Sequence, residues 1–402
     1  MMYRTHFILH VAKFAPKDRN IFPNLSKYCS RNLAQSPKPV TEPNEGANKK
    51  SAAIVKAYGE KLVIEEIKHP DPATHKLGKD DVVIQPKTSS LTFADLLMIQ
   101  GKYQIKPDVP FVAGREVSGK ILETGGDVKD FKKGDKIFAF LPNGGGFANT
   151  MILPQKNCFA LPQNMDYKVA SSLYTSYITA YLGLVYKGNL TSHDKVLVTG
   201  AGGAVGMAAV DICANAYKTK VIGVTSSPEK SEAIRQKGAF ATIELSNLYK
   251  TSVNAESEKK KVNGKIIESP IKQKVLALTD GKGVDLIYET LGGSIFEDCV
   301  KCLSFDGRLL IIGFSSGTIP SIQTNRLLLK NHTLIGFTMT NYYNQEPNTI
   351  FQESFQAISS YWEKSYIHPT IDPQSFDLSK INDAIEYLKH KKSIGKVIIN
   401  LE

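Results

Sequence analysis

A glycine-rich stretch in the middle of the chain has the residue types and spacing that bind phosphate. An apolar run at 195–199 leads into it, and an alanine-rich segment at 207–216 follows. Glycines let a phosphate approach the free N–H groups and the positive dipole end of the next helix. We therefore predict a dinucleotide site at Ala201, Gly202, Gly203, Ala204, Val205 and Gly206; a degenerate fold without cofactor is the alternative.

The residues after the next strand decide between NAD and NADP. An acidic residue about 20 positions beyond the glycines would bind the ribose 2′-hydroxyl of NAD, but Thr225 stands there. Ser226 can donate a hydrogen bond, and Lys230 adds a cation one turn into the following helix. Glu229 is explained as part of a helix cap with Ser226. A cation without an acid favours a 2′-phosphate, so we predict NADP(H) as the cofactor.

Strands and helices must alternate around these residues to position them. Beyond the glycines, the apolar runs that predict strands are 220–224, 284–288 and 309–312. Alternating strand and helix signals indicate a doubly wound parallel sheet. The region before it is rich in strands and glycine turns instead, with strands predicted at 82–84, 117–122 and 136–140. The fold class is therefore α/β, a Rossmann sheet with a separate β-rich domain.

Charge, hydropathy and cysteine content exclude several functions. Residues 1–50 and 244–274 carry +6 and +3 of the net charge of +11, so the basic residues concentrate in two segments, which argues against a general nucleic-acid surface on the body. No apolar run approaches the ~18 residues of a membrane span. Cys299 and Cys302 form a CxxC pair on a predicted helix, but no second pair completes a zinc site, so we interpret them as structural.

The first 33 residues have the composition of a mitochondrial transit peptide. They hold six basic residues against the single acid Asp18, and Phe7, Val11 and Phe14 fall on one helical face. Basic, amphipathic, acid-poor leaders direct proteins to mitochondria. The residues that follow, 34–51, have linker composition. We predict a mitochondrial matrix location, with an ordinary basic tail as the alternative.

The motifs taken together resemble the zinc-free branch of the medium-chain dehydrogenase/reductase superfamily, the quinone oxidoreductase or zeta-crystallin-like family. Zinc alcohol dehydrogenases of that superfamily carry a Cys near position 92 and a His near 115, where this chain has Thr92 and Arg115. The four-Cys lobe is also missing from 136–149. The stretches that carry the resemblance are 93–95, 101–104, 110–119, 133–135, 200–206, 325–336, 380–384 and 395–397.

The resemblance implies an organisation in domains. It implies a GroES-like catalytic domain at 52–180, a Rossmann NADP-binding domain at 181–340 with an insertion at 246–274, and a return segment at 341–402 that completes the catalytic domain. A homodimer or homotetramer is also implied. Further cofactor contacts are implied after later strands, at Leu291, Gly292, Gly293, Ile312, Gly313, Phe314 and Ser315.

Three functions stay open. The first is an NADPH-dependent reductase that transfers a hydride to a quinone or similarly activated carbonyl compound without a metal. The second is a reductase of carbon–carbon double bonds in enones or enoyl thioesters, in which Tyr103 protonates the α-carbon. The third is a protein that holds NADPH or RNA and turns over little. Tyr103 is predicted to contact the nicotinamide end, and Thr92 and Tyr103 to line the substrate site; Thr92 stands where the family usually has Asn.

Overall fold

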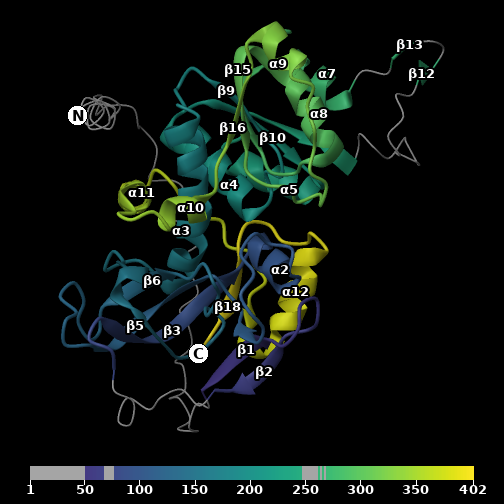
Figure 1. Ribbon diagram of the computed structural model, residues 1–402. Helices are drawn as coiled ribbons and strands as arrows, with labels where there is room; N and C mark the ends of the chain where they lie inside the picture. Colours follow the sequence, from purple (N-terminus) through teal and green to yellow (C-terminus); the bar gives the residue numbers. More distant parts are fainter. Residues whose placement is uncertain (1–49, 68–76, 247–260, 263–264, 267–268) are drawn as a thin grey trace, which may run out of the picture. The chain divides into compact units, whose positions relative to one another are not determined.

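The structure, a computed structural model, describes residues 50–67, 77–246, 261–262, 265–266 and 269–402 (Figure 1). The described residues belong to one compact unit of the chain. The predicted leader at 1–33 and nearly all of the linker at 34–51 lie outside them, as does most of the insertion at 246–274. Among the described helices, none has the length and apolar character that a bilayer crossing needs.

One half of the unit is built on a six-stranded sheet in the order β11-β10-β9-β14-β15-β16. Every neighbouring pair in it is parallel. From β9 the chain builds outward to β10 and β11 on one side, and then from β14 to β15 and β16 on the other side. This is the Rossmann strand order, which confirms that prediction. The strands are β9 (Lys195–Val198), β10 (Lys220–Thr225), β11 (Ala241–Glu244), β14 (Val284–Glu289), β15 (Leu303–Ile311) and β16 (Thr333–Gly336).

Alternation along these strands sends apolar side chains to both faces of the sheet, so each face needs its own cover. Val196 and Val198 pack with α4 and α5 in one core, while Leu197 lies in a second core with α7 and α8. The helices of this half are α4 (Ala204–Asp211), continued by a π-turn Ile212–Ala216, then α5 (Pro228–Gln236), α7 (Pro270–Leu278), α8 (Gly293–Cys302) and α9 (Asn325–Lys330).

The predicted insertion, 246–274, extends too far toward the C-terminus, because its last residues form the start of α7. Helix α7 begins at Pro270, with the Ser269 side chain accepting from the Lys272 N–H as its cap. Ile271 is fully buried against the sheet. Residues 270–274 therefore belong to the covering helix. Two short strands, β12 (Lys261–Val262) and β13 (Lys265–Ile266), pair within the part that precedes it.

The other half is the predicted β-rich domain. Its main sheet has the order β17-β18-β3-β5-β6-β8, with β7 paired to β3, and a smaller sheet has the order β2-β1-β4. A third core lies inside these strands. The elements are β1 (Ser51–Val55), β2 (Val63–Glu66), β3 (Asp81–Leu91), α2 (Phe93–Ile99), β4 (Phe111–Val112), β5 (Glu116–Thr124), β6 (Lys136–Phe140), β7 (Met151–Pro154), a 3₁₀ turn Gln155–Asn157, β8 (Cys158–Ala160), β17 (Phe376–Asp377) and β18 (Val397–Asn400).

Two chain segments connect the halves. Helix α3 (Tyr167–Tyr181), continued by a π-turn Leu182–Lys187, is buried along most of its length and packs against β3, β5 and α4. After β16 the chain forms α10 (Met339–Tyr343) and α11 (Thr349–Glu363), and Phe355 of α11 stacks on Tyr174 of α3. It then enters the β-rich domain through β17, a 3₁₀ turn Leu378–Lys380, α12 (Ile381–Lys389) and β18. Within the predicted return segment, α12 and β18 lie in the β-rich core, whereas α11 packs on α3.

Candidate active site

The glycine loop lies between β9 and α4, where the sequence predicted it. Gly203 is the N-cap of α4 and no side chain accepts a hydrogen bond there, so the first amides of the helix are open to an anion. A Cβ on Gly206 would come 2.3 Å from the Gly200 carbonyl oxygen, so only glycine lets the helix pack this closely. A Cβ on Gly202 would meet the Lys230 side chain at 2.8 Å. The loop therefore has the geometry of a phosphate cradle, and a lysine lies beside it.

Lys230 meets a second lysine at this cradle. Its Nζ donates to the main-chain carbonyl of Lys391 at 2.6 Å, which brings together α5 and the turn after α12. Burial, and next the positive charge of Lys391, lower the pKa of Lys230. In the part of the chain that the structure describes, neither lysine lies at ion-pair distance from a carboxylate, although the charge of Asp372 acts on Lys230 and opposes the lowering of its pKa. Two cations without an ion-paired carboxylate are suited to a phosphate, and sequence reasoning found only one of them.

The two serines before α5 have different roles from those predicted: Ser227 caps the helix and Ser226 does not. Ser226 is exposed and available to a ligand. Ser227, and not Ser226, is the N-cap of α5, its side chain accepting from the Lys230 N–H at 3.4 Å. Thr225 is buried and its hydroxyl bonds to Ser231 at 2.6 Å, so it points away from the ligand side. The predicted cap formed by Ser226 and Glu229 is therefore wrong by one residue.

The two predicted cofactor turns at the ends of later strands, 291–293 after β14 and 312–315 after β15, are hydrogen-bonded to each other. The N–H groups of Leu291 and Gly292 donate to the buried Glu289 carboxylate at 2.8 and 3.0 Å. Ser315 N–H donates to the Thr290 carbonyl, and Gly293 N–H to that of Thr318. These amides are already used, so the first turn offers a cofactor its carbonyls and surface, not these donors. Glu289, missed by sequence reasoning, shapes the turn, and burial raises its pKa. Ile312, Gly313 and Phe314 lie in the second turn, after β15.

Tyr103 contacts an arginine that the sequence singled out only as a departure from the zinc enzymes. The Arg115 guanidinium donates to the Tyr103 hydroxyl at 3.2 Å and to the Thr340 hydroxyl at 3.0 Å. Its central carbon lies 4.7 Å from the centre of the Tyr103 ring. Tyr103 is half-buried. The site therefore places a phenol beside a fixed cation.

Thr92 was predicted to line the substrate site, but its hydroxyl is already hydrogen-bonded to Asp95. It is the N-cap of α2: its hydroxyl accepts from the Asp95 N–H and donates to the Asp95 carboxylate, while that carboxylate also accepts from the Thr92 N–H. This reciprocal capping box orients α2 and the loop to Tyr103. Burial raises the pKa of Asp95, and the charge of Arg115 opposes this effect. The geometry thus gives Thr92 a positioning role.

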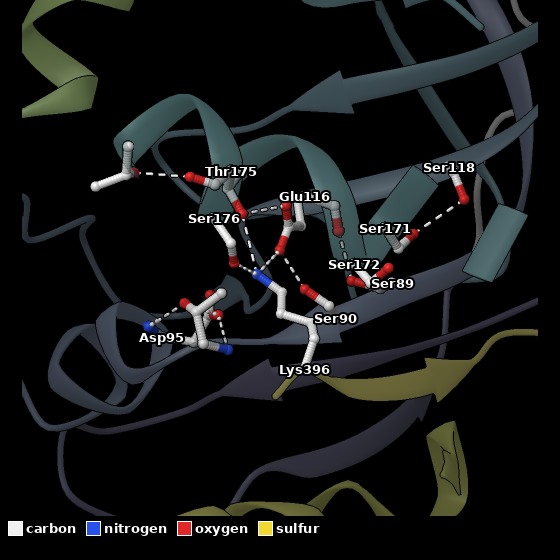
Figure 2. Close-up of polar contacts among 12 residues, drawn as sticks. Ser89, Ser90, Asp95, Glu116, Ser118, Ser171, Ser172, Thr175, Ser176 and Lys396 are labelled. Atoms are coloured by element: carbon white, nitrogen blue, oxygen red, sulfur yellow. Dashed lines mark hydrogen bonds and ion pairs between the residues drawn. The ribbon is translucent and has the colours of Figure 1, made fainter. Parts of the chain in front are cut away.

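A buried ion pair lies where the halves meet (Figure 2). Lys396 donates to Glu116 at 2.6 Å, to Thr175 at 3.0 Å and to Ser176 at 3.2 Å. The hydroxyls of Ser90 and Thr175 donate to the same carboxylate. The residue before the lysine, Gly395, donates its N–H to the Gly202 carbonyl at 3.0 Å. The network therefore anchors the glycine loop to β3, β5, α3 and the start of β18. In the sequence, the only sign of this network is a lysine that precedes an apolar run.

Two further features lie apart from these groups. Cys299 and Cys302 are buried in α8, and burial raises the pKa of Cys302 to about 12, as a structural role predicts. Among the described residues no three His, Cys, Asp or Glu side chains are grouped as metal ligands would be.

An open groove of about 1330 Å³ runs between β8 and α11, lined by Phe159, Tyr343 and Phe355 among others, and none of the predicted site residues lines it.

Comparison with known proteins agrees with this architecture. Residues 78–163 match the alcohol dehydrogenase GroES-like domain and residues 204–358 match the zinc-binding dehydrogenase family. The quinone oxidoreductase-like protein 2 homolog of Nematostella vectensis is 36% identical over 349 residues, which are 87% of this chain and 88% of that protein. Quinone oxidoreductase-like protein 2 of Rattus norvegicus is 32% identical over 351 residues, 87% of this chain and 92% of that protein.

A solved structure extends the comparison to three dimensions. The quinone oxidoreductase of Thermus thermophilus, determined also as a complex with NADPH, superposes with a TM-score of 0.69 at 25% identity, covering 87% of this chain and all of that one. The fold and the two family matches define a medium-chain dehydrogenase/reductase with a GroES-like domain. The chain belongs to the quinone oxidoreductase-like part of this superfamily.

Proposed function

We propose that the protein is an NADPH-dependent reductase that transfers a hydride to a quinone or similarly activated carbonyl compound without zinc. The observation that carries the proposal is the pair of lysines, Lys230 and Lys391, beside the open glycine cradle. The relatives named quinone oxidoreductase-like protein 2, and a similar quinone oxidoreductase solved with NADPH, support it. The side chains at the zinc-ligand positions are Thr92 and Arg115, which do not form a zinc site.

The residues present fit this cofactor. The amides at the start of α4 and the bare backbone of Gly202 and Gly203 would hold the pyrophosphate. Ser226, Lys230 and Lys391 would hold the 2′-phosphate. When bound, the cofactor supplies the hydride and its electron pair. The protein orients it and the substrate, and Tyr103 would contact the nicotinamide end.

The test is a pair of substrate panels with the purified full chain. NADPH oxidation is followed with a series of quinones and with a series of enones and enoyl thioesters. Turnover that prefers quinones supports the proposal. Turnover restricted to enoyl thioesters supports the alternative below. Tight NADPH binding with neither panel turned over contradicts the proposal and favours a binding protein, for which salt-dependent RNA binding is then measured.

One observation favours the second candidate, reduction of an activated carbon–carbon double bond. The Tyr103 oxygen accepts its hydrogen bond from Arg115, so the phenol keeps its own proton for donation. Reduction of such a bond requires a proton at carbon, which a positioned acid delivers. A quinone does not need this acid, because the oxygens of its product take protons from water.

We also propose that the protein is a homodimer. Strand β16 is at the edge of the Rossmann sheet, where its outer backbone groups are unpaired in the described unit. Phe305, Ile319, Leu328 and Leu329 are all more than two-thirds exposed on the segments beside it. An apolar patch at a sheet edge suits a second copy of the chain in a twofold interface. Light scattering of the wild type and of L328E/L329E tests this: a wild-type monomer, or an unchanged mass in the variant, would contradict it.

A further inference from the structure

Arg115 is a buried cation without a carboxylate at ion-pair distance among the described residues, although its charge acts on the buried Asp95. It is 5% exposed, and no ion pair to it is found in the described part of the chain. Its Nε hydrogen has no acceptor, and the nearby buried carboxylate of Asp95 has one oxygen, Oδ1, without a donor. A guanidinium stays charged at every accessible pH, so it cannot escape the cost of burial by losing its proton. An anion or a developing negative charge that reached the free Nε hydrogen would therefore stabilise this group.

The neighbours of Arg115 hold it beside Tyr103, the residue predicted to contact the nicotinamide end. The side chain leaves the chain just before β5, after Gly114, which has a φ of +91°. It lies 4.7 Å from the ring centre of Tyr103 and 5.3 Å from that of Phe140. Thr340, at the start of α10, fixes the far end of the guanidinium from the segment that follows the Rossmann sheet. A planar cation that is clamped between rings presents its donors with little loss of entropy.

We infer that Arg115 is a catalytic residue, whose guanidinium hydrogen-bonds the carbonyl oxygen of the substrate and stabilises the negative charge that develops there. This rests on the proposed reductase function. A fixed donor aimed at a developing oxyanion in a dry site stabilises the transition state more than the ground state. The substrate class that fits is a carbonyl conjugated to the carbon or oxygen that receives the hydride.

The electrons balance for both candidate substrates. A quinone that gains a hydride becomes a hydroquinone monoanion, whose oxygen pairs with Arg115 and then takes one proton from water. An enone or enoyl thioester that gains the hydride at its β-carbon becomes an enolate, whose oxygen pairs with Arg115 while the α-carbon takes one proton from Tyr103. In both cases two electrons and one hydrogen come from the hydride, and one proton follows.

The decisive experiment uses 4-nitrophenol, a chromophore that carries the charge of the product on one oxygen. Its ionisation is titrated by absorbance when it is bound to the full chain, with and without NADP⁺. A cation within a few ångströms should lower its apparent pKa by about 1–3 relative to free solution. R115M should abolish this effect, and R115K should retain part of it, because charge remains but the planar donors are lost.

Controls separate this role from a purely structural one. R308M removes an arginine that pairs with Asp194, at a distance from the site, and should leave the phenol titration as in the wild type. If R115M lowers the melting temperature while the phenol titrates as in the wild type, Arg115 is only a clamp between Tyr103 and Thr340. No phenol binding to the wild-type protein, or an unshifted pKa in it, also overturns the inference.

Activity gives a second readout. With whichever substrate the panels identify, R115M should lose about 10²–10³-fold in kcat, the effect of removing one oxyanion donor, with NADPH affinity unchanged. A loss of less than about fivefold would overturn the inference. If neither panel is turned over, the proposed function fails, whereas the phenol titration still decides the role of Arg115.

Discussion

The ammonium group of Lys396 lies 2.6 Å from the carboxylate of Glu116, and both side chains are buried. The two residues come from opposite ends of the folded chain, β5 and the residue just before β18. Hydroxyl groups occupy further hydrogen-bonding positions of both partners. The next residue toward the N-terminus, Gly395, holds the glycine loop through its N–H group. The ion pair and the adjacent Gly395 hydrogen bond thus join the sheet of the β-rich domain to the glycine loop.

Removing one member of this pair should destabilise the protein strongly. We expect K396M to lower the free energy of unfolding by about 3–5 kcal/mol, because it leaves the Glu116 carboxylate buried and without its counter-charge. The control is K389M, which breaks the half-exposed pair with Glu386 and should have a far smaller effect, because solvent screens such a pair. Urea unfolding measures both. Equal losses of unfolding free energy in the two variants would contradict the claim that the buried ion pair stabilises the protein more than the exposed one.

Lys230 should set the preference for NADPH. K230A should weaken NADPH binding by about 1–3 kcal/mol, the range for hydrogen bonds to charged groups, and should leave NADH nearly unchanged. K391A should have a similar but smaller effect, since the structure shows only its carbonyl at Lys230. R235A, an exposed change on the same helix, is the control. Equal affinity of the wild type for both cofactors, by fluorescence titration, would contradict this interpretation.

The glycine cradle could be predicted from the sequence because its signals are local. The strand, the glycines, the helix and Lys230 all lie within about one βαβ unit, and their periodicity identifies them. The Rossmann order of the sheet followed from the alternation of strands and helices. Ser226 and Ser227 could not be told apart, since both are cap-forming residues one position from each other and only the backbone geometry decides.

The residues that sequence reasoning missed reach the site through long-range contacts. Lys391 lies in the turn after α12 and Lys396 just before β18, and they meet α5 and β5 only because the chain returns to the first domain. Glu289 is the last residue of the apolar strand β14 and has no spacing that marks it as the acceptor of the amides that follow. Arg115 could be recognised as an absent zinc ligand, but its orphaned charge depends on which groups pack around it.

The purified protein should contain far less than one zinc per chain. The positions that would supply ligands hold Thr92 and Arg115, and a guanidinium cannot coordinate a metal ion. Elemental analysis after purification without chelators measures this directly, and activity should survive extensive treatment with a chelator. Stoichiometric zinc, or activity that is lost with the chelator and restored by zinc, would overturn the zinc-free assignment.

The basic leader should direct the protein to mitochondria. Residues 1–50, fused to a fluorescent reporter, should give a mitochondrial signal, because the first 33 residues are basic, amphipathic and nearly free of acids. The matched control replaces Arg4, Lys13 and Lys17 with Gln, which removes charge and keeps the apolar residues. A diffuse signal from the unaltered leader, or an unchanged signal from the control, would reject this location or its electrostatic cause.

Tyr103→Phe separates the two candidate reactions. The variant keeps the ring beside Arg115 and removes only the hydroxyl that accepts its hydrogen bond. If the substrate is a quinone, the reduced oxygen takes its proton from water, and we expect little loss of rate. If the substrate is an enone or enoyl thioester, a carbon must be protonated in a site closed to water, and the loss should be about 10²–10⁴-fold.

NADPH affinity must be measured in the same variant, because Tyr103 is also predicted to contact the nicotinamide end. A loss in kcat with unchanged affinity reports on proton transfer, whereas a change in affinity with unchanged kcat reports on binding alone. We expect the small effect, in keeping with a quinone substrate. A hundredfold loss in kcat on a quinone, with NADPH binding intact, would contradict that assignment, since it would require the tyrosine proton in a reaction whose product oxygen has water as a proton source.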